Sequence, residues 1–342
     1  MHKNTSIVII GAGIGGLTMA CALYRQGYQP LVFERTAKIQ PIGAGIILSA
    51  NAMAQLNKLD LAQTILQQGR PITNVSIQNQ YGKCLSSINQ SKVQQQYSFP
   101  SVAISRSALH NIILSSLPDQ CVQLAHEFNA INFLDQHNTQ VKFANGYSIQ
   151  ADIVIGADGI NSQLRAAVLG KYLLRHSGQT CYRALAASSK ETHKFFESWG
   201  NGKRFGAVPI SQEQVYWYAV LENKQNNIQA DDKVNMSLEK LFNSWHQPIS
   251  ELISATPAID IIHTDIYDAI PTKKWFKNNV VFLGDAIHPT TPNLGQGASM
   301  AIESAVTLAS SMSKYENTEA AFIHYQQQRQ AYTARITKQS GI

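Results

Sequence analysis

The sequence feature that most constrains the fold is a glycine-rich stretch, SIVIIGAGIGG, that begins at Ser6. An apolar run leads into a G-x-G-x-x-G pattern, an apolar-periodic helix is predicted over about 14–26, and a second strand over 30–34. This order of strand, glycine turn, helix and strand predicts a βαβ unit. The three glycines of the pattern are Gly11, Gly13 and Gly16.

Each glycine has a physical role in holding a dinucleotide. Gly11 allows the tight turn, Gly13 lets the backbone approach a pyrophosphate at the helix N-terminus, and Gly16 permits close helix–strand packing. Glu34 ends the second strand 23 residues after Gly11. Its carboxylate can accept hydrogen bonds from both ribose hydroxyls of an adenosine and would repel a 2′-phosphate, which favours FAD or NAD over NADP. A glycine-rich turn without a ligand is the alternative interpretation.

Later segments predict the remainder of an α/β pattern. Residues 101–105 are predicted as a strand that leads into a Ser-capped helix, and residues 141–150 as a hairpin around Asn145-Gly146. A buried strand and turn are predicted at 151–159, and the Gln-rich residues 91–99 are predicted as a surface loop.

The chain changes character between about 172 and 270, where aromatic and β-branched residues predict strands with two short helices. The α/β pattern returns from 280, and a long helix is predicted over about 317–338. We therefore predict an α/β fold in which a Rossmann-like, nucleotide-binding domain is discontinuous and a β-sheet substrate domain is inserted into it. The nucleotide-binding domain is predicted to comprise 1–72, 100–171 and 272–342, and the substrate domain 73–99 and 172–271.

Charge and cysteine usage argue against several other classes of protein. The formal charge of +6 comes from 28 Lys+Arg against 22 Asp+Glu, but the basic residues are scattered, which argues against nucleic acid as a partner. No apolar window reaches the length of an integral membrane segment. The four cysteines are far apart and the histidines are dispersed, so neither a metal site nor a redox motif is predicted. A reduced, cytoplasmic compartment fits this cysteine usage best.

Two further motifs separate the possible cofactors. One is ADIVIGADGINSQLRAAVLG, with Asp158 and Gly159, and the other is VVFLGDAIHPTTPNLGQGASMAIESA, with Asp285. Both aspartates follow apolar strands, where ligands bind in α/β sheets, although either one alone could serve as a helix N-cap. Together with the glycine pattern, these motifs resemble the class A flavoprotein monooxygenases, the single-component aromatic hydroxylases related to p-hydroxybenzoate hydroxylase.

The resemblance implies FAD as the cofactor and assigns residues to it. It implies that Asp285 holds the ribityl hydroxyls, and that Asp158 serves both FAD and a transient NADH or NADPH. It also implies that Arg106 contacts the cofactor and that residues 292–299 cover the isoalloxazine and the pyrophosphate. The implied cofactor residues are Gly11, Gly13, Gly16, Glu34, Arg35, Gly43, Ala44, Gly45, Arg106, Asp158, Gly159, Asp285, Pro292, Gly295, Gln296, Gly297, Ala298 and Ser299.

The same resemblance implies a reaction and a substrate site. NADH or NADPH would reduce FAD, and the reduced flavin would add O2 to give a C4a-hydroperoxide that hydroxylates a small aromatic or heteroaromatic substrate. The segment GKRFGAVPISQEQVYWYAV is similar to bacterial FAD-dependent urate hydroxylases, which implies Arg204 and Tyr216 as catalytic residues. Arg204 could pair with an anionic group and Tyr216 could hydrogen-bond and stack. Tyr182 and Arg183 are a rival pair, and a surface Arg with a sheet-packing Tyr is the structural alternative.

Three further expectations complete the sequence-based interpretation. A flavin reductase or dehydrogenase of the geranylgeranyl-reductase type, and a truncated non-catalytic flavin-binding protein, remain alternative functions. His288 is expected to orient its loop rather than to act as a general base. The family usually continues past the helix that ends near Lys338, so either the last helix is dispensable or the chain is a shortened version with weaker packing over the insert. A monomer or a homodimer is expected.

Overall fold

The glycine-rich unit lies at the centre of a six-stranded sheet in the computed structural model, which describes residues 2–39, 43–188, 192–222 and 233–341. β1 is fully buried and pairs in parallel with β12 on one side and β2 on the other, and β19 pairs in parallel with β12. The carboxyl ends of β1, β12 and β19 are therefore neighbours at one edge. The strand order is β18 (Phe276–Lys277), β19 (Val280–Phe282), β12 (Ile153–Gly156), β1 (Ile7–Ile10), β2 (Leu31–Phe33) and β8 (Val122–Gln123).

Helices pack around this sheet and complete its core. α1 contacts both α5 and α9, and α9 also contacts α10, so the first and last thirds of the chain share one apolar core. The long helix predicted over about 317–338 is confirmed as α10. The helices of this part are α1 (Ile14–Arg25), α2 (Ala50–Asn57), α3 (Ala62–Gln68), α4 (Ser91–Tyr97), α5 (Arg106–Leu114), α6 (Gln163–Leu169), α9 (Gly297–Lys314) and α10 (Thr318–Ser340).

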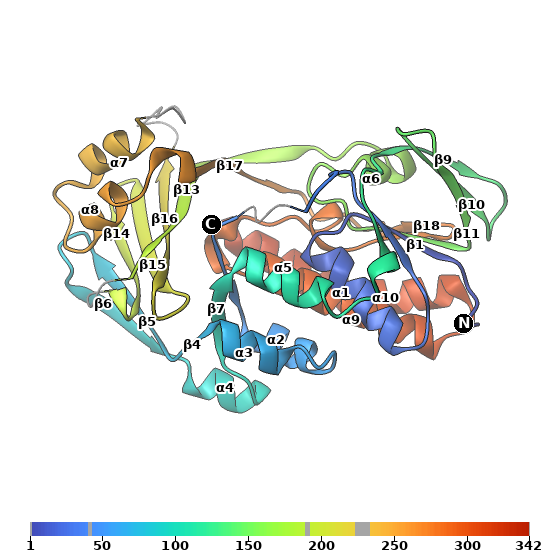
Figure 1. Ribbon diagram of the computed structural model, residues 1–342, viewed down its shortest axis with the longest axis horizontal. Helices are drawn as coiled ribbons and strands as arrows, with labels where there is room; N and C mark the ends of the chain where they lie inside the picture. The colour runs from blue at the N-terminus through green and yellow to red at the C-terminus, as the bar shows by residue number, and fades with distance from the viewer. Residues whose placement is uncertain (1, 40–42, 189–191, 223–232, 342) are drawn as a thin grey trace.

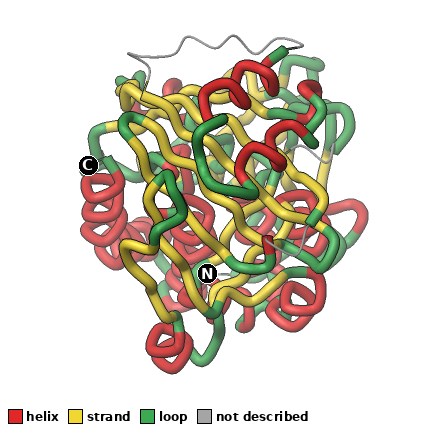
Figure 2. The backbone as a smooth tube through the Cα atoms, turned by 90° about the vertical axis from the view of Figure 1, so that its left-hand side faces the viewer, coloured by secondary structure: helices red, strands yellow, loops and turns green. Residues whose placement is uncertain are grey.

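A seven-stranded sheet forms a second layer with its own apolar core. Figure 1 shows it at the left, where α7 (Val234–Phe242) and α8 (Ile249–Ser254) cover its outer side. Figure 2 shows its strands lying in front of most of the helices. Its strands, in order, are β17 (Ile262–Ala269), β13 (Leu174–Ala187), β16 (Gln214–Glu222), β15 (Lys203–Pro209), β14 (Phe195–Gly200), β5 (Asn74–Asn79) and β6 (Cys84–Asn89).

Two small sheets complete the architecture. One contains β11 (Ser148–Ala151), β10 (Thr139–Phe143) and β9 (Phe128–Phe133), and the other contains β3 (Gly45–Leu48), β7 (Ser101–Ser105) and β4 (Arg70–Ile72). The β10–β11 hairpin confirms the turn predicted at Asn145-Gly146, because Gly146 has the positive φ of +85° that such a turn needs. The predicted Ser cap is also confirmed, since Ser105 Oγ accepts from Ala108 N at 3.1 Å.

The prediction of a surface loop over residues 91–99 is wrong, because Ser91–Tyr97 form α4. Gln, Lys and Ser have adequate helix propensity, so a glutamine-rich composition does not prevent a helix. The Asn89 Oδ1 atom accepts a hydrogen bond from Ser91 N at 2.8 Å at the start of this segment, and α4 packs beside α2. Packing against α2 thus stabilises a helix that the composition alone does not predict.

The division of the chain into two domains remains our proposal. It is supported by β5 and β6, which come from the early segment 73–99 and extend the seven-stranded sheet. All four cysteines are free. Cys84 is exposed on β6, whereas Cys21, Cys121 and Cys181 are buried. In the described ranges, no helix combines the length and apolarity needed to cross a bilayer, and no cluster of three His, Cys, Asp or Glu side chains forms a metal site.

Candidate active site

The glycine loop is packed on its protein side and open on its outer side. A Cβ at Gly11, whose φ is +103°, would lie 2.6 Å from the Ala157 carbonyl oxygen, and one at Gly16 would lie 1.9 Å from the Gly11 carbonyl oxygen. A Cβ at Gly13 would meet no atom of the described residues within 4 Å. No side chain caps the start of α1 at Gly13, so its first amide groups are available to a ligand.

The Glu34 carboxylate lies against this loop from the end of β2. Its Oε2 atom accepts from Ala12 N at 2.9 Å and its Oε1 atom accepts from Thr36 N at 3.0 Å. These two amides fix the carboxylate at the rim of the glycine turn and leave further acceptor capacity on both oxygens. Arg35 is exposed next to it.

Asp158 follows β12 at the same edge of the sheet. Its Oδ2 atom accepts from Leu164 N in the first turn of α6 at 3.3 Å, which partly fits the N-cap alternative, although Ser162 is the residue that caps α6. Its Oδ1 atom is buried and has no hydrogen-bond partner in the described part of the chain. Burial raises the pKa of the Asp158 carboxyl group. A buried acceptor without a partner is costly, and a ligand hydroxyl or amide would satisfy it.

Asp285 lies in a short turn, Gly284–Ala286, that follows β19. Its side chain is accessible to solvent, although desolvation by surrounding protein atoms raises the pKa of its carboxyl group and Arg106 opposes that shift. An accessible carboxylate surrounded by protein is the arrangement expected in a concavity. Arg165 Nη1 donates to the Ala286 carbonyl oxygen at 2.9 Å, and Tyr172 Oη donates to the Ile287 carbonyl oxygen at 3.2 Å, so the turn is held from two sides.

The segment 292–299 continues from this turn into α9. Gly295 has a φ of +62°, and its N–H donates to the Pro292 carbonyl oxygen at 2.8 Å, so the tight turn needs glycine. α9 begins at Gly297 without a side-chain cap, and the Oε1 atom of the preceding Gln296 is buried without a hydrogen-bond partner among the described residues. Ser299, in contrast, has a structural contact, because its Oγ atom accepts from Ser49 N at 3.2 Å.

The loop of residues 43–45 passes between Arg106 and Tyr216. The Ala44 carbonyl oxygen accepts from Arg106 N at 2.9 Å, and a Cβ at Gly43 would lie 2.8 Å from Arg106 Cδ. A Cβ at Gly45 would lie 2.4 Å from Tyr216 Cβ, so only glycine fits where β3 meets the seven-stranded sheet. This loop therefore joins the glycine-rich half of the site to the sheet.

Arg204 and Tyr216 lie on one face of the seven-stranded sheet, on the neighbouring strands β15 and β16. Arg204 on β15 pairs with Val220 of β16, and Val208 pairs with Tyr216. Tyr218 lies between them, and its ring occupies the space above Gly206, where a Cβ would be 2.1 Å away. Burial raises the pKa of the Tyr216 hydroxyl, so it remains a protonated donor at neutral pH.

Arg204 contacts two residues that the sequence analysis did not single out. Its Nη1 atom lies 3.5 Å from Oε1 of Glu197 on β14, and its Nη2 atom donates to Oδ1 of Asn293 at 2.6 Å. The Nδ2 atom of Asn293 donates in turn to the Ser340 carbonyl oxygen at 2.7 Å, at the end of α10. The guanidinium is thus linked both to the sheet and to the 292–299 segment.

The rival pair Tyr182 and Arg183 is separated by the pleat of β13. Tyr182 is buried in the core on the outer side of the sheet and stacks on His263, with ring centroids 4.7 Å apart. Arg183 points to the other face, where it pairs in register with Tyr218. Tyr182 therefore cannot share a site with Tyr216, because alternate residues of a strand face opposite sides.

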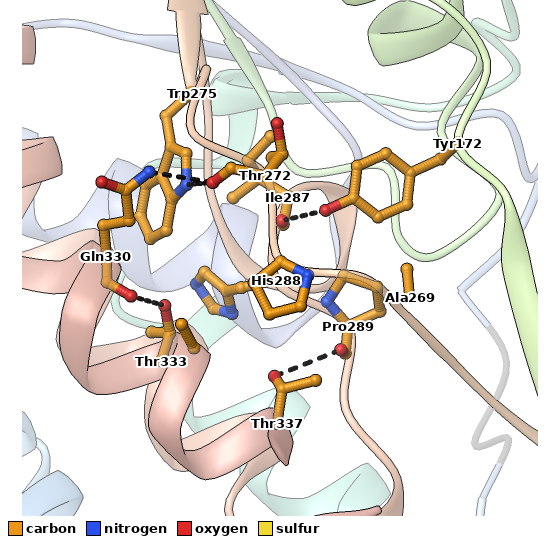
Figure 3. Close-up of a pocket in the computed structure, with 12 residues that line it drawn as sticks. Tyr172, Ala269, Thr272, Trp275, Ile287, His288, Pro289, Gln330, Thr333 and Thr337 are labelled. Carbon is orange, nitrogen blue, oxygen red and sulfur yellow. Dashed lines mark hydrogen bonds between the residues drawn. The ribbon is translucent and has the colours of Figure 1, made fainter.

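His288 lies behind the Asp285 turn and lines a small cavity of about 10 Å³ beside Trp275 and Thr337 (Figure 3). That volume admits at most one water molecule. The His288 Nε2 atom is 3.0 Å from Ser304 Oγ, and its Nδ1 atom is buried and finds no hydrogen-bond partner in the ranges that the structure describes. Burial and the nearby Arg329 lower the pKa of His288 to about 3, so the imidazole is neutral and fits a structural role.

This lowered pKa gives a prediction for stability. The unfolded chain protonates His288 near the ordinary pKa of 6.5, whereas the folded chain does so only near 3. The free energy of unfolding of the wild type should therefore fall by about 1.4 kcal/mol per pH unit because of this group, as the pH falls from about 6.5 towards about 3. In urea unfolding at several pH values, the free energy of unfolding of His288→Gln should fall less steeply with falling pH than that of wild type. His137→Gln, at an exposed position, should follow wild type. Parallel curves for wild type and His288→Gln would contradict the assignment.

The residues present fit an FAD molecule. The open side of Gly13, the free amides of α1, the unpartnered Asp158 Oδ1 and the accessible Asp285 carboxylate meet at the carboxyl ends of three adjacent parallel strands. Amides suit a pyrophosphate and carboxylates suit sugar-type hydroxyls. The fold and the site together define a flavoprotein of the dinucleotide-binding α/β type.

Known proteins identify the family. The family described as FAD binding domain matches residues 4–340. The chain is 36% identical to aurachin C monooxygenase/isomerase of Stigmatella aurantiaca over 95% of this chain and 85% of that protein. It is 33% identical to 2-heptyl-3-hydroxy-4(1H)-quinolone synthase of Pseudomonas aeruginosa over 98% of this chain and 88% of that protein. The crystal structure of Klebsiella pneumoniae HpxO complexed with FAD and uric acid superposes with a TM-score of 0.93 at 25% identity, covering 99% and 88% of the two chains.

The chain therefore belongs to this family of FAD-dependent monooxygenases of the class A type. Membership confirms the predicted α/β fold, the oxidoreductase class and FAD as the cofactor. The roles assigned to individual residues in binding FAD and substrate remain predictions.

Proposed function

We propose that this protein hydroxylates a small aromatic or heteroaromatic compound, with NADH or NADPH as a transient reductant and O2 as the oxidant. In the balanced reaction one oxygen atom enters the substrate, and the other leaves as water with electrons from the nicotinamide. One observation carries the proposal. The carboxyl ends of β1, β12 and β19, where FAD would bind, lie beside the face of the seven-stranded sheet that bears Arg204 and Tyr216. Residues 43–45 connect the two, since they contact both Arg106 and Tyr216.

The cofactor residues have distinct proposed roles. Amides of the Gly13 turn would bind the pyrophosphate, Glu34 the adenosine ribose and Asp285 the ribityl hydroxyls. Asp158, after the central strand β12, would add a hydrogen-bond acceptor for the cofactor, and Arg106 would lie beside the flavin. FAD supplies the redox and oxygen chemistry when bound, while the protein binds, orients and excludes water.

Arg204 and Tyr216 are the residues proposed to contact the substrate. Both project from the sheet face that looks towards β3, and Tyr216 packs directly on Gly45. The protonated Tyr216 hydroxyl can donate to a ring oxygen or nitrogen, and its ring offers a surface for stacking. The name of the quinolone synthase states a hydroxylated heteroaromatic product, and the HpxO structure holds uric acid, so the relatives support a heteroaromatic substrate.

The function is tested by aerobic oxidation of NADH and NADPH by FAD-loaded protein across a panel of candidate rings. The panel includes salicylate, hydroxybenzoates, urate and 4-quinolones. At least one compound should stimulate oxidation and give an oxygenated product. Absence of stimulation and of product from every compound would overturn the proposed substrate class.

Labelled O2 separates this function from its rivals. A monooxygenase incorporates heavy oxygen from O2 into the product, whereas a reductase or dehydrogenase of the geranylgeranyl-reductase type incorporates none. A non-catalytic flavin-binding protein would bind FAD and show no turnover of NADH or NADPH with any substrate. Sedimentation of the same preparations would distinguish a monomer from a homodimer.

A variant of Arg204 tests the substrate face separately from the cofactor site. Arg204→Met should bind FAD normally but raise KM roughly tenfold or more, because a charge-assisted hydrogen bond contributes about 1.5–3 kcal/mol. Steady-state kinetics and FAD content measure the two effects. Arg25→Met, at an exposed position in the last turn of α1, is the control. A KM in Arg204→Met equal to that of wild type would show that Arg204 does not contact the substrate.

A further inference from the structure

The charge of Arg204 is compensated within the protein before any substrate binds. Its guanidinium lies 3.5 Å from the Glu197 carboxylate, and the two side chains are only 22% and 14% exposed. Little water is therefore available to screen the pair. On the other side, the hydrogen bond of 2.6 Å to Asn293 Oδ1 fixes the guanidinium, and Asn293 is itself held by the Ser340 carbonyl oxygen.

Glu197 is held as firmly as its partner. Tyr218 Oη donates to its Oε2 atom, and Trp199 Nε1 donates to its Oε1 atom at 2.6 Å. Burial and the adjacent carboxylate raise the pKa of Tyr218 well above its ordinary value, so Tyr218 remains a donor at neutral pH. Three donors thus converge on one carboxylate on the substrate-facing side of the sheet.

We propose that Glu197 is a specificity-determining residue that makes this face select an uncharged heteroaromatic ring over an anionic one, which rests on the function proposed above. An anion that approaches Arg204 also approaches Glu197, and attraction and repulsion at similar distances largely cancel. A neutral ring carbonyl can accept from the guanidinium without that repulsion, so the ligand class is a neutral pyridone- or quinolone-type ring.

The remaining charges around the site do not restore a preference for anions. Arg183 on the same sheet face and Arg106 across the 43–45 loop add positive charge, and Asp285 adds negative charge. The diphosphate of the FAD that this family binds carries two further negative charges. With the cofactor bound, the charges named here, all from described residues or the cofactor, sum to no surplus of positive charge that would attract a carboxylate.

A matched pair of ligands tests the selectivity directly. The compounds 2-methyl-4-quinolone and kynurenate share one ring system and differ at one position, where a methyl group replaces a carboxylate. Kd values are measured on FAD-loaded protein from the change in flavin absorbance, without reductant. Wild type should bind the neutral compound at least about tenfold more tightly, and Glu197→Gln should shift the ratio of Kd values by roughly tenfold towards kynurenate, as expected when one fixed charge is removed.

Two controls separate the charge effect from general damage. The double variant Glu197→Gln with Arg204→Met should lose the gain in kynurenate binding, because the uncompensated guanidinium is gone. Glu213→Gln, an exposed glutamate next to β16, should leave the ratio unchanged.

The outcomes decide the proposal in either direction. Wild type that binds kynurenate as tightly as the quinolone overturns it, and so does an unchanged ratio in Glu197→Gln. If Glu197→Gln does not retain FAD, the wild-type ratio alone decides. Because these measurements need no turnover, a selective protein that yields no oxygenated product would overturn the monooxygenase proposal and leave the selectivity standing.

Discussion

Replacing Gly13 by alanine should give a folded protein that binds FAD poorly, whereas the same change at Gly16 should strongly destabilise the fold. Within the described part of the chain, a Cβ at Gly13 meets no atom within 4 Å, so the unliganded fold should tolerate it. That open side is where the turn would receive the pyrophosphate, and a methyl group there would hold the cofactor away from the amides. The steric cost of about 1–3 kcal/mol corresponds to a roughly 5- to 150-fold weaker affinity for FAD.

At Gly16 the added atom meets the protein itself. Its Cβ would lie 1.9 Å from the Gly11 carbonyl oxygen, and this neighbour is backbone that cannot rotate away. Gly16→Ala should therefore cost about 3 kcal/mol or more in the free energy of unfolding. Urea unfolding without FAD and FAD titration of the refolded protein measure the two effects. Equal stability losses in the two variants, or normal FAD affinity in Gly13→Ala, would contradict the assigned roles.

Asp285→Ala should lower FAD affinity by about 10- to 150-fold, since a hydrogen bond to a charged group contributes about 1.5–3 kcal/mol. The turn that carries Asp285 is fixed by Arg165 and Tyr172 through backbone carbonyl oxygens, so loss of the carboxylate should leave its path intact. Stability without FAD should consequently change little.

Isothermal titration with FAD checks this expectation, and Asp260→Ala, at an exposed position in the second layer, is the matched control. Asp285→Asn should lie between wild type and alanine, because the amide oxygen still accepts a hydrogen bond without the charge. Unchanged affinity in Asp285→Ala would remove this residue from the cofactor site.

The parts of the fold that could be predicted from the sequence depend on local chemistry. The βαβ unit follows from apolar runs joined by glycines whose backbone conformation or close contacts exclude a side chain, as Gly11 and Gly16 show. The hairpin at Asn145-Gly146 and the Ser105 cap are equally local. These signals need only a few residues on each side, so a single sequence displays them.

The parts that could not be predicted depend on contacts between distant segments. Tyr218 could have been found, because it lies two residues from Tyr216 and a strand places both on one face. Glu197 and Asn293 could not, since their contacts with Arg204 depend on the pairing of β14 with β15 and on how the loop before α9 meets the sheet. A sequence-based interpretation therefore located Arg204 but not the carboxylate that compensates it.

The distribution of the cysteines has a practical consequence for studying movement. Cys84 is the exposed thiol, at the edge of the seven-stranded sheet, while burial raises the pKa of Cys121 and of Cys181 to about 11 and makes both thiols poor nucleophiles. The third buried thiol, Cys21, also has a raised pKa. A thiol-reactive fluorophore should therefore attach at one position without any mutation. Energy transfer between that dye and the natural fluorescence of a bound flavin would measure whether the distance between the sheet and the cofactor changes during turnover.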